Sequence, residues 1–243
     1  MNTRSRIKTC AKRGEATLRE YLAIACIGAS FAEDPALRGL RAVLIHRRNQ
    51  GKVGWTDLPI TPAFGSEARD IIATLIAEVL HYWSRRNLNN FDLLQHRVWE
   101  LRGEIDRYDF DRFLDEELAV LAPSDVTEAI ARCVADLLLC AERLNLSSAD
   151  LFKNGLHLFV ADLNQLRFEK LPREEQQAHV TLASLVDENL ILGFRPHGYE
   201  GDGMWNVQEN QLDSRVVPTE DVAAYAERRR ELLRSRPARK RPE

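Results

Sequence analysis

The sequence is poor in cysteine. It contains four cysteines in 243 residues, and no two of them form a CxxC pair. This spacing supports neither a zinc site nor a disulfide framework. Phosphate loops ending in GK[ST], GxSxG nucleophile turns and HExxH or HxxxH metal motifs are also missing. These absences exclude P-loop nucleotide hydrolases, α/β-hydrolases and helical zinc enzymes from the candidate functions.

Long apolar runs are missing as well. The longest apolar stretch covers residues 21–32, whereas a helix needs about 20 apolar residues to cross a bilayer. The basic first residues are not followed at once by an apolar region, as they are in a secretory signal peptide. We therefore expect a cytoplasmic protein that makes no contact with a membrane.

Charge is unevenly distributed along the chain. Residues 1–13 carry five basic groups and no acid, and residues 228–243 carry eight basic groups and two acids. The body between these ends has a net charge of −14, although the whole chain has only −3. Basic ends bind phosphate backbones by releasing counterions, or they remain solvated. We expect a basic N-terminal tail at 1–13, a single helical domain at 14–218, and a C-terminal helix with an Arg-rich tail at 219–243.

Helical periodicity is the main signal that is present. The predicted helices cover residues 14–32, 35–49, 67–86, 91–107, 110–122, 125–145, 147–170, 173–188 and 219–235. Residues 190–217 contain four glycines and few β-branched residues, a composition typical of loops with at most a short hairpin. The sequence therefore predicts an all-α, multi-helix bundle of about eight or nine helices with a loop-rich segment near 190–217.

The helix predicted at 125–145 contains one carboxylate whose position is ambiguous. Its apolar face consists of Val126, Ile130, Cys133, Val134, Leu137, Leu138 and Ala141. Asp136 lies about 110° from the centre of that face, taking about 3.6 residues per turn. Glu128, Arg132 and Asp136 are spaced four residues apart, so they form a ladder of opposite charges on a polar flank. One interpretation of Asp136 is therefore a surface carboxylate paired with Arg132.

A second interpretation comes from the stretch "DEELAVLAPSDVTEAIARCVADLLLCAERLNLSSADLF" at 115–152. It resembles the second half of the all-α nucleotide pyrophosphohydrolases of the MazG and dimeric dUTPase superfamily. Members of that superfamily have a helix with an EExxE motif, a short spacer and a helix with an ExxD motif. Their carboxylates hold Mg²⁺, a hard cation that prefers oxygen ligands, and the metal positions the water that attacks the nucleotide.

The resemblance assigns residues one at a time. Glu116 and Glu117 match the paired acids of the first motif, and Asp136 matches the final acid of the second. Val120 and Cys133 stand where the two remaining glutamates would be. The resemblance thus implies that Glu116, Glu117 and Asp136 are catalytic and bind Mg²⁺, with a nucleotide as substrate, in an active hydrolase or a degenerate relative of one.

Other assignments remain open. An alternative alignment uses Glu100 and Glu104 as the upstream acids. A different class of function is a non-catalytic helical interaction module whose basic tails contact nucleic acid or an acidic protein. A small-molecule pocket between helices, with residues 190–217 as its lid, is a third interpretation. The glycine-rich part of that segment, residues 193–205, either cradles an anion or is a polar surface loop. A homo-oligomer is a further expectation.

Overall fold

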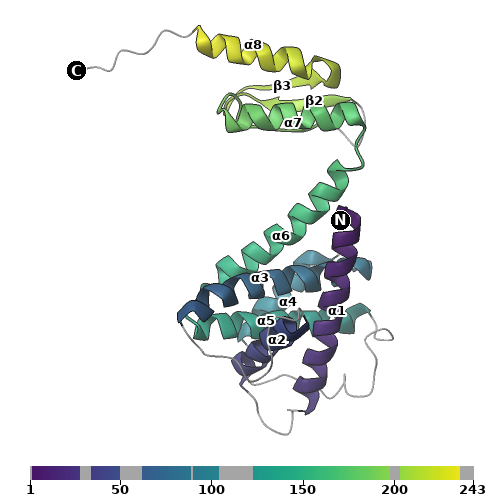
Figure 1. Cartoon of the computed structure of the whole chain (residues 1–243), viewed down its shortest axis with the longest axis vertical. Coiled ribbons are helices and arrows are strands. Elements are labelled where there is room, and N and C mark those ends of the chain that lie inside the picture. The colour runs from purple at the N-terminus through teal and green to yellow at the C-terminus, as the bar shows by residue number, and fades with distance from the viewer. Residues whose placement is uncertain are drawn as a thin grey trace, which may run out of the picture. The chain divides into compact units, whose positions relative to one another are not determined.

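The computed structural model describes residues 2–27, 34–49, 62–88, 90–103, 123–197 and 203–235. Within these ranges the chain forms eight α-helices and one small three-stranded sheet (Figure 1). The prediction of a mostly helical fold with about eight helices is confirmed, and the sheet lies in the segment predicted to be rich in loops. The helix predicted at 110–122 is outside the described residues.

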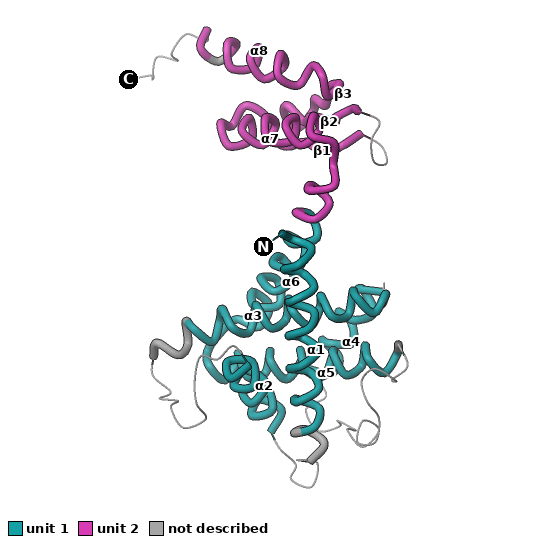
Figure 2. Tube along the Cα trace, turned by 45° about the vertical axis from the view of Figure 1, so that its right-hand side comes forward, with its two compact units in different colours: residues 1–164 teal, residues 165–243 magenta. Residues whose placement is uncertain are grey.

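The elements follow one another along the chain in two groups. The helices are α1 (Thr3–Ile27), α2 (Pro35–Asn49), α3 (Pro62–Arg85), α4 (Phe91–Gly103), α5 (Pro123–Arg143), α6 (Ser148–Phe168), α7 (Arg173–Asp187) and α8 (Val222–Arg234). The strands are β1 (Gly193–Pro196), β2 (Met204–Gln208) and β3 (Ser214–Pro218), and a short 3₁₀ turn, η3 (Thr219–Asp221), precedes α8. Packing divides the chain into unit 1, residues 1–164, and unit 2, residues 165–243 (Figure 2). This division falls inside α6, within the stretch predicted as one domain.

Helix α5 is the central element of unit 1, because it packs against α1, α2, α3 and α4. Its predicted apolar face is buried throughout. Burial extends beyond that face: Ala131, Arg132 and Ala135, on other sides of the helix, are also buried. A helix surrounded on several sides in this way buries residues that an amphipathic pattern would assign to solvent.

Two glycines allow the helices of unit 1 to approach closely. A Cβ atom on Gly39 of α2 would lie 2.1 Å from the backbone oxygen of Asp136 in α5. A Cβ atom on Gly14 of α1 would lie 2.3 Å from the backbone oxygen of Glu78 in α3. Each glycine therefore brings a neighbouring helix directly against a turn that carries a buried carboxylate.

The first helix begins earlier than the sequence predicts. Helix α1 starts at Thr3, so the segment predicted as a basic tail at 1–13 is helical from its third residue. The side chain of Asn2 accepts a hydrogen bond from the backbone N–H of Ser5 at 2.8 Å, which is the pattern of an N-cap. The sequence does not predict this N-cap, because many of the residues that follow it are charged and an apolar helical pattern does not begin there.

Unit 2 is a three-stranded antiparallel sheet with the order β1-β2-β3 and two helices. Side chains alternate between the two faces of β2. Trp205 and Val207 therefore lie on the same face, in a core that also contains residues of α7 and α8. The indole N–H of Trp205 donates a hydrogen bond to Thr219 at 2.9 Å, which ties the core to η3. The strands are only four or five residues long, so the alternation is too short to recognise in the sequence.

Among the described helices, none combines the length and the apolar character that a membrane crossing requires.

Candidate functional site

Asp136 is fully buried and is held by residues of two other helices. Its carboxylate accepts two hydrogen bonds from the guanidinium of Arg38 in α2, at 2.8 Å from Nε to Oδ2 and 3.2 Å from Nη2 to Oδ1. The hydroxyl of Tyr21 in α1 donates a third, at 2.6 Å to Oδ2. The exposed fraction is 0% for Asp136 and 7% for Arg38. The arrangement is a bidentate, charge-assisted ion pair shut away from water.

The predicted pairing of Asp136 with Arg132 on an exposed flank is wrong. Arg132 instead donates to Glu128 at 2.8 Å, and Glu128 also accepts from Arg97 of α4 at 2.8 Å. Burial acts to raise the pKa of Glu128, but the hydrogen bonds from Arg97 and the charge of Arg132 outweigh it and hold the pKa below its usual value. Of the predicted ladder, only the pair of Glu128 and Arg132 forms. Asp136 pairs instead with Arg38 of α2.

The described residues at Asp136 do not fit a magnesium ion. Both carboxylate oxygens are engaged by the cationic guanidinium of Arg38, and a second cation at the same oxygens would be repelled. Cys133, one turn earlier, is buried, and its burial raises the pKa of the thiol so that it stays protonated. Within the described ranges, no three histidine, cysteine or acidic side chains converge to hold a metal ion.

Two of the three residues that the resemblance assigns cannot be placed. Glu116 and Glu117 lie outside the described residues, as do Glu104 and Val120. Glu100 is described: it lies in α4, where it contacts His96 and Arg97. The magnesium site formed by Glu116 and Glu117 therefore stays a prediction.

A second buried carboxylate, Glu78 of α3, was not singled out from the sequence. It is 2% exposed. Its Oε1 lies 3.7 Å from a guanidinium nitrogen of Arg13, and its Oε2 lies 3.4 Å from Nδ1 of the buried His46. Burial raises the pKa of Glu78 to about 7, although Arg13 acts in the opposite direction. The sequence does contain a sign of this buried acid, because Glu78 lies among Leu75, Val79 and Tyr82 on an otherwise apolar face of α3.

One turn along α3, His81 forms a related cluster. Its Nε2 lies 3.2 Å from Oδ2 of Asp162 in α6, and Asp162 also pairs with Arg6 of α1. Burial lowers the pKa of His81, and the charge of Asp162 opposes that effect. No local spacing in the sequence predicts this partner for His81, because Asp162 follows it by 81 positions.

The basic residues of α1 fall into three sets, of which the first is Arg19, paired with Glu15 four residues earlier. Arg6 and Arg13 reach inward to Asp162 and Glu78. Arg4, Lys8 and Lys12 are exposed, and none of the three pairs with a carboxylate in the described part of the chain. Their spacing of four residues places them on one side of the helix, about 6 Å apart along its axis. The helix therefore presents a row of three unpaired cations to solvent.

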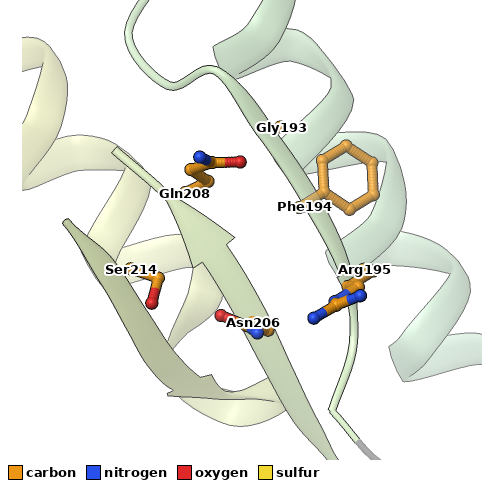
Figure 3. Close-up of a pocket in the computed structure, with 6 residues that line it drawn as sticks. All are labelled: Gly193, Phe194, Arg195, Asn206, Gln208 and Ser214. Atoms are coloured by element: carbon orange, nitrogen blue, oxygen red, sulfur yellow. The ribbon is translucent and has the colours of Figure 1, made fainter. Parts of the chain in front are cut away.

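The outer face of the sheet in unit 2 carries polar side chains together with the exposed Val216. A hollow of about 490 Å³ lies on it, lined by Gly193, Phe194, Arg195, Asn206, Gln208 and Ser214 (Figure 3). Arg195, which belongs to the glycine-rich segment 193–205 expected to cradle an anion or to form a polar surface loop, projects from β1 next to this hollow. His197 follows the strand and is exposed, whereas Glu200 and Asp202 are outside the described residues.

A second hollow lies in unit 1, where α3, α4 and α5 meet. Its volume is about 320 Å³, and its wall includes Trp83, Leu88, Leu93 and Thr127. Trp83 itself is 5% exposed and packs against Phe91, so it is a core residue. This hollow adjoins the start of α5, which follows residues outside the described ranges.

Comparison with protein-family models, with curated proteins and with solved structures gives no match to this chain. Its function must therefore be inferred from its own side chains.

Proposed function

We propose that this protein is a non-catalytic nucleic-acid-binding module whose helix α1 contacts the phosphate backbone. The row formed by Arg4, Lys8 and Lys12 carries this proposal. Two other cations of the same helix are committed to buried or half-buried carboxylates, whereas these three are exposed and unpaired within the described structure. Duplex DNA carries one negative charge about every 1.7 Å of its axis, so a row about 12 Å long faces several phosphates at once.

The surroundings of the row favour a polyanion over a membrane. The exposed positions on the first four turns of α1 are polar or charged except Ala16, and they include no large apolar side chain. A helix that lies in a membrane interface needs an apolar face turned to the lipid, and the apolar face of α1 is packed into unit 1 instead. The acidic body of the chain opposes coating of the protein by nucleic acid, so binding is local to α1.

Helix α8 contributes less positive charge for DNA binding than its number of arginines suggests. Of its arginines, Arg229 contacts Glu209 and the backbone oxygen of Leu190, and Arg230 pairs with Glu188. Residues 236–243 lie outside the described part of the chain. The N-terminal helix is therefore the basic element on which the proposal rests.

The alternative, a Mg²⁺-dependent nucleotide pyrophosphohydrolase, is supported only by the resemblance at 115–152. The pairing of Asp136 with Arg38 favours the degenerate form of that proposal. A screen of nucleotides with and without Mg²⁺ distinguishes the two functions, because only the hydrolase predicts turnover that Glu117→Gln abolishes.

Salt dependence tests the DNA-binding proposal. We expect the triple variant Arg4→Gln/Lys8→Gln/Lys12→Gln to bind duplex DNA more weakly, regardless of its sequence. Each phosphate contact contributes about 0.9 to the slope of log K against log salt, so the slope should become shallower by about 2.7. Fluorescence anisotropy of a labelled duplex across a salt series measures both quantities.

A matched control removes the same charge elsewhere in unit 1. Arg69, Arg85 and Lys153 are exposed cations on α3 and α6, and they do not form a row. The variant Arg69→Gln/Arg85→Gln/Lys153→Gln should keep the wild-type slope. Equal slopes for the α1 variant and the wild type would refute the proposal.

A further inference from the structure

The outer face of the sheet in unit 2 is free of both helices. Residues alternate between the two sides of a strand, and in β2 the buried positions are Trp205 and Val207. The intervening residues, Asn206 and Gln208, therefore project from the opposite side. They are accompanied across the sheet by Arg195 of β1 and Ser214 of β3, which the register pairs with Asn206 and Gln208.

The side chains around the hollow are polar, and Arg195 adds a positive charge, while Val216 of β3, which the register pairs with Asn206 on the same face, is apolar and exposed. Figure 3 shows the guanidinium of Arg195 extending from β1 toward β2, where Asn206 lies, and it shows the Gln208 amide extending toward β1. Arg195 is exposed and forms no ion pair within the described structure. Among the described residues of the three strands, none is acidic.

Gly193 keeps the hollow open. It lies opposite Gln208 in the register, and a Cβ atom added to it would meet nothing within 4 Å. Its φ angle is not in the left-handed region, so neither the backbone nor the packing demands a glycine at this position. A side chain here would extend into the space beside the Gln208 amide.

We infer that this outer face, defined by Arg195, Asn206, Gln208 and Ser214 around Gly193, reads base edges in the major groove of duplex DNA. The inference rests on the proposed function. A primary amide presents one donor and one acceptor in a plane and pairs with adenine, and a guanidinium pairs with guanine. Asn206 and Gln208 are about 6.8 Å apart along β2, so they reach different base pairs.

The dimensions of the face agree with this ligand. Three strands spaced about 4.8 Å apart make a surface about 10 Å wide, and the major groove of B-DNA is about 12 Å wide. The corresponding groove of an RNA duplex is too narrow for side chains to read. Trp205 is buried in the core of unit 2, and Phe194, which packs against that core, is the one aromatic residue among the described residues that line the hollow, so no second ring stands beside it to stack successive single-stranded bases.

The test uses the full-length chain and a duplex enriched from a random library by binding to the wild type. The ratio of affinities for the enriched duplex and for a scrambled one measures base reading. We expect Asn206→Ala/Gln208→Ala to lower this ratio about tenfold or more and to leave the salt slope unchanged. Gly193→Leu, which fills open space without removing a hydrogen-bonding group, should lower the ratio too.

The control variant removes the same two residue types elsewhere. Asn154 of α6 and Gln211 of the β2–β3 turn are exposed, so Asn154→Ala/Gln211→Ala should keep the wild-type ratio. Circular dichroism checks that all variants fold.

Each contrary result has a distinct meaning. If Asn206→Ala/Gln208→Ala keeps the wild-type ratio of affinities, base reading by this face is overturned and the proposed function stands. The same holds if no sequence is enriched from the random library. Poly-L-glutamate is added as a competitor of DNA binding. If it competes with the wild type but not with the same variant, the face binds acidic protein, and base reading is again overturned. Failure of the wild type to bind any duplex overturns both this inference and the proposed function.

Discussion

The variant Arg38→Met is expected to lose about 3–5 kcal/mol of unfolding free energy, because it leaves the carboxylate of Asp136 buried without its countercharge. Methionine preserves much of the apolar stem of arginine, so the loss reports the charge more than the packing. Urea unfolding followed by far-UV circular dichroism measures the change. Hydrogen exchange of α5 peptides assigns the transition to unit 1, because the two units need not unfold together.

The matched variants separate the ion pair from its surroundings. Arg38→Met/Asp136→Leu removes both charges and should recover most of the loss, since a buried pair is often replaceable by apolar residues. Tyr21→Phe removes one hydrogen bond to a charged group, worth about 1.5–3 kcal/mol. Arg48→Met breaks a pair with Glu20 whose members are both more than one-third exposed, and it should cost less than about 1 kcal/mol.

A small effect of Arg38→Met, close to that of Arg48→Met, would contradict the burial of this pair. Asp136 would then be accessible to water or to another cation, and the magnesium site implied by the resemblance would regain its third ligand.

Features of this fold that depend on neighbours along the chain can be predicted from the sequence, whereas contacts between distant residues cannot. The apolar face of α5 was identified correctly because its residues lie at helical spacing within one segment. Ser147 was likewise recognised as the start of α6, and its hydroxyl accepts a hydrogen bond from the N–H of Asp150 at 3.3 Å. Both features depend on neighbours within a few residues, for which spacing rules exist.

Asp136 shows where this local reasoning fails. A helical wheel places it on a flank and offers Arg132 as the nearest cation, whereas the actual partner, Arg38, precedes it by 98 positions. Glu78 and His81 were missed for the same reason, since their partners lie on α1, α2 and α6. A partner on another helix is set by the packing of the helices, and a single sequence carries no spacing rule for that packing.

The outer face of the sheet was predictable only in part. The glycine-rich segment 193–205, which contains Arg195, is recognisable from its composition as a candidate for anion binding or as a polar surface loop. Asn206 and Gln208 were not singled out, because an outward position in β2 is defined only once the register with β1 and β3 is known.

A second large effect is expected at Glu78, where the stability of the wild type should fall as the pH rises from about 5 to 7. Burial raises the pKa of this carboxyl from 4.5 to about 7 in the folded state. Between these values the folded chain holds a proton that the unfolded chain has released, so raising the pH favours unfolding. A shift of this size corresponds to about 3 kcal/mol, lost as the pH passes from the unfolded to the folded pKa.

Glu78→Gln should remove this pH dependence and make the protein more stable than the wild type at pH 8, because its side chain is neutral at every pH and has nearly the same shape. Asp70→Asn, at an exposed position of the same helix, is the control and should keep the wild-type profile. Three residues surround the carboxyl: Arg13 and His46 by contact, and Gly14 by the close approach of α1. If wild-type stability instead rises from pH 5 to 7, Glu78 is ionised and paired throughout that range, and α1 is then held to α3 by a buried salt bridge with Arg13 or His46.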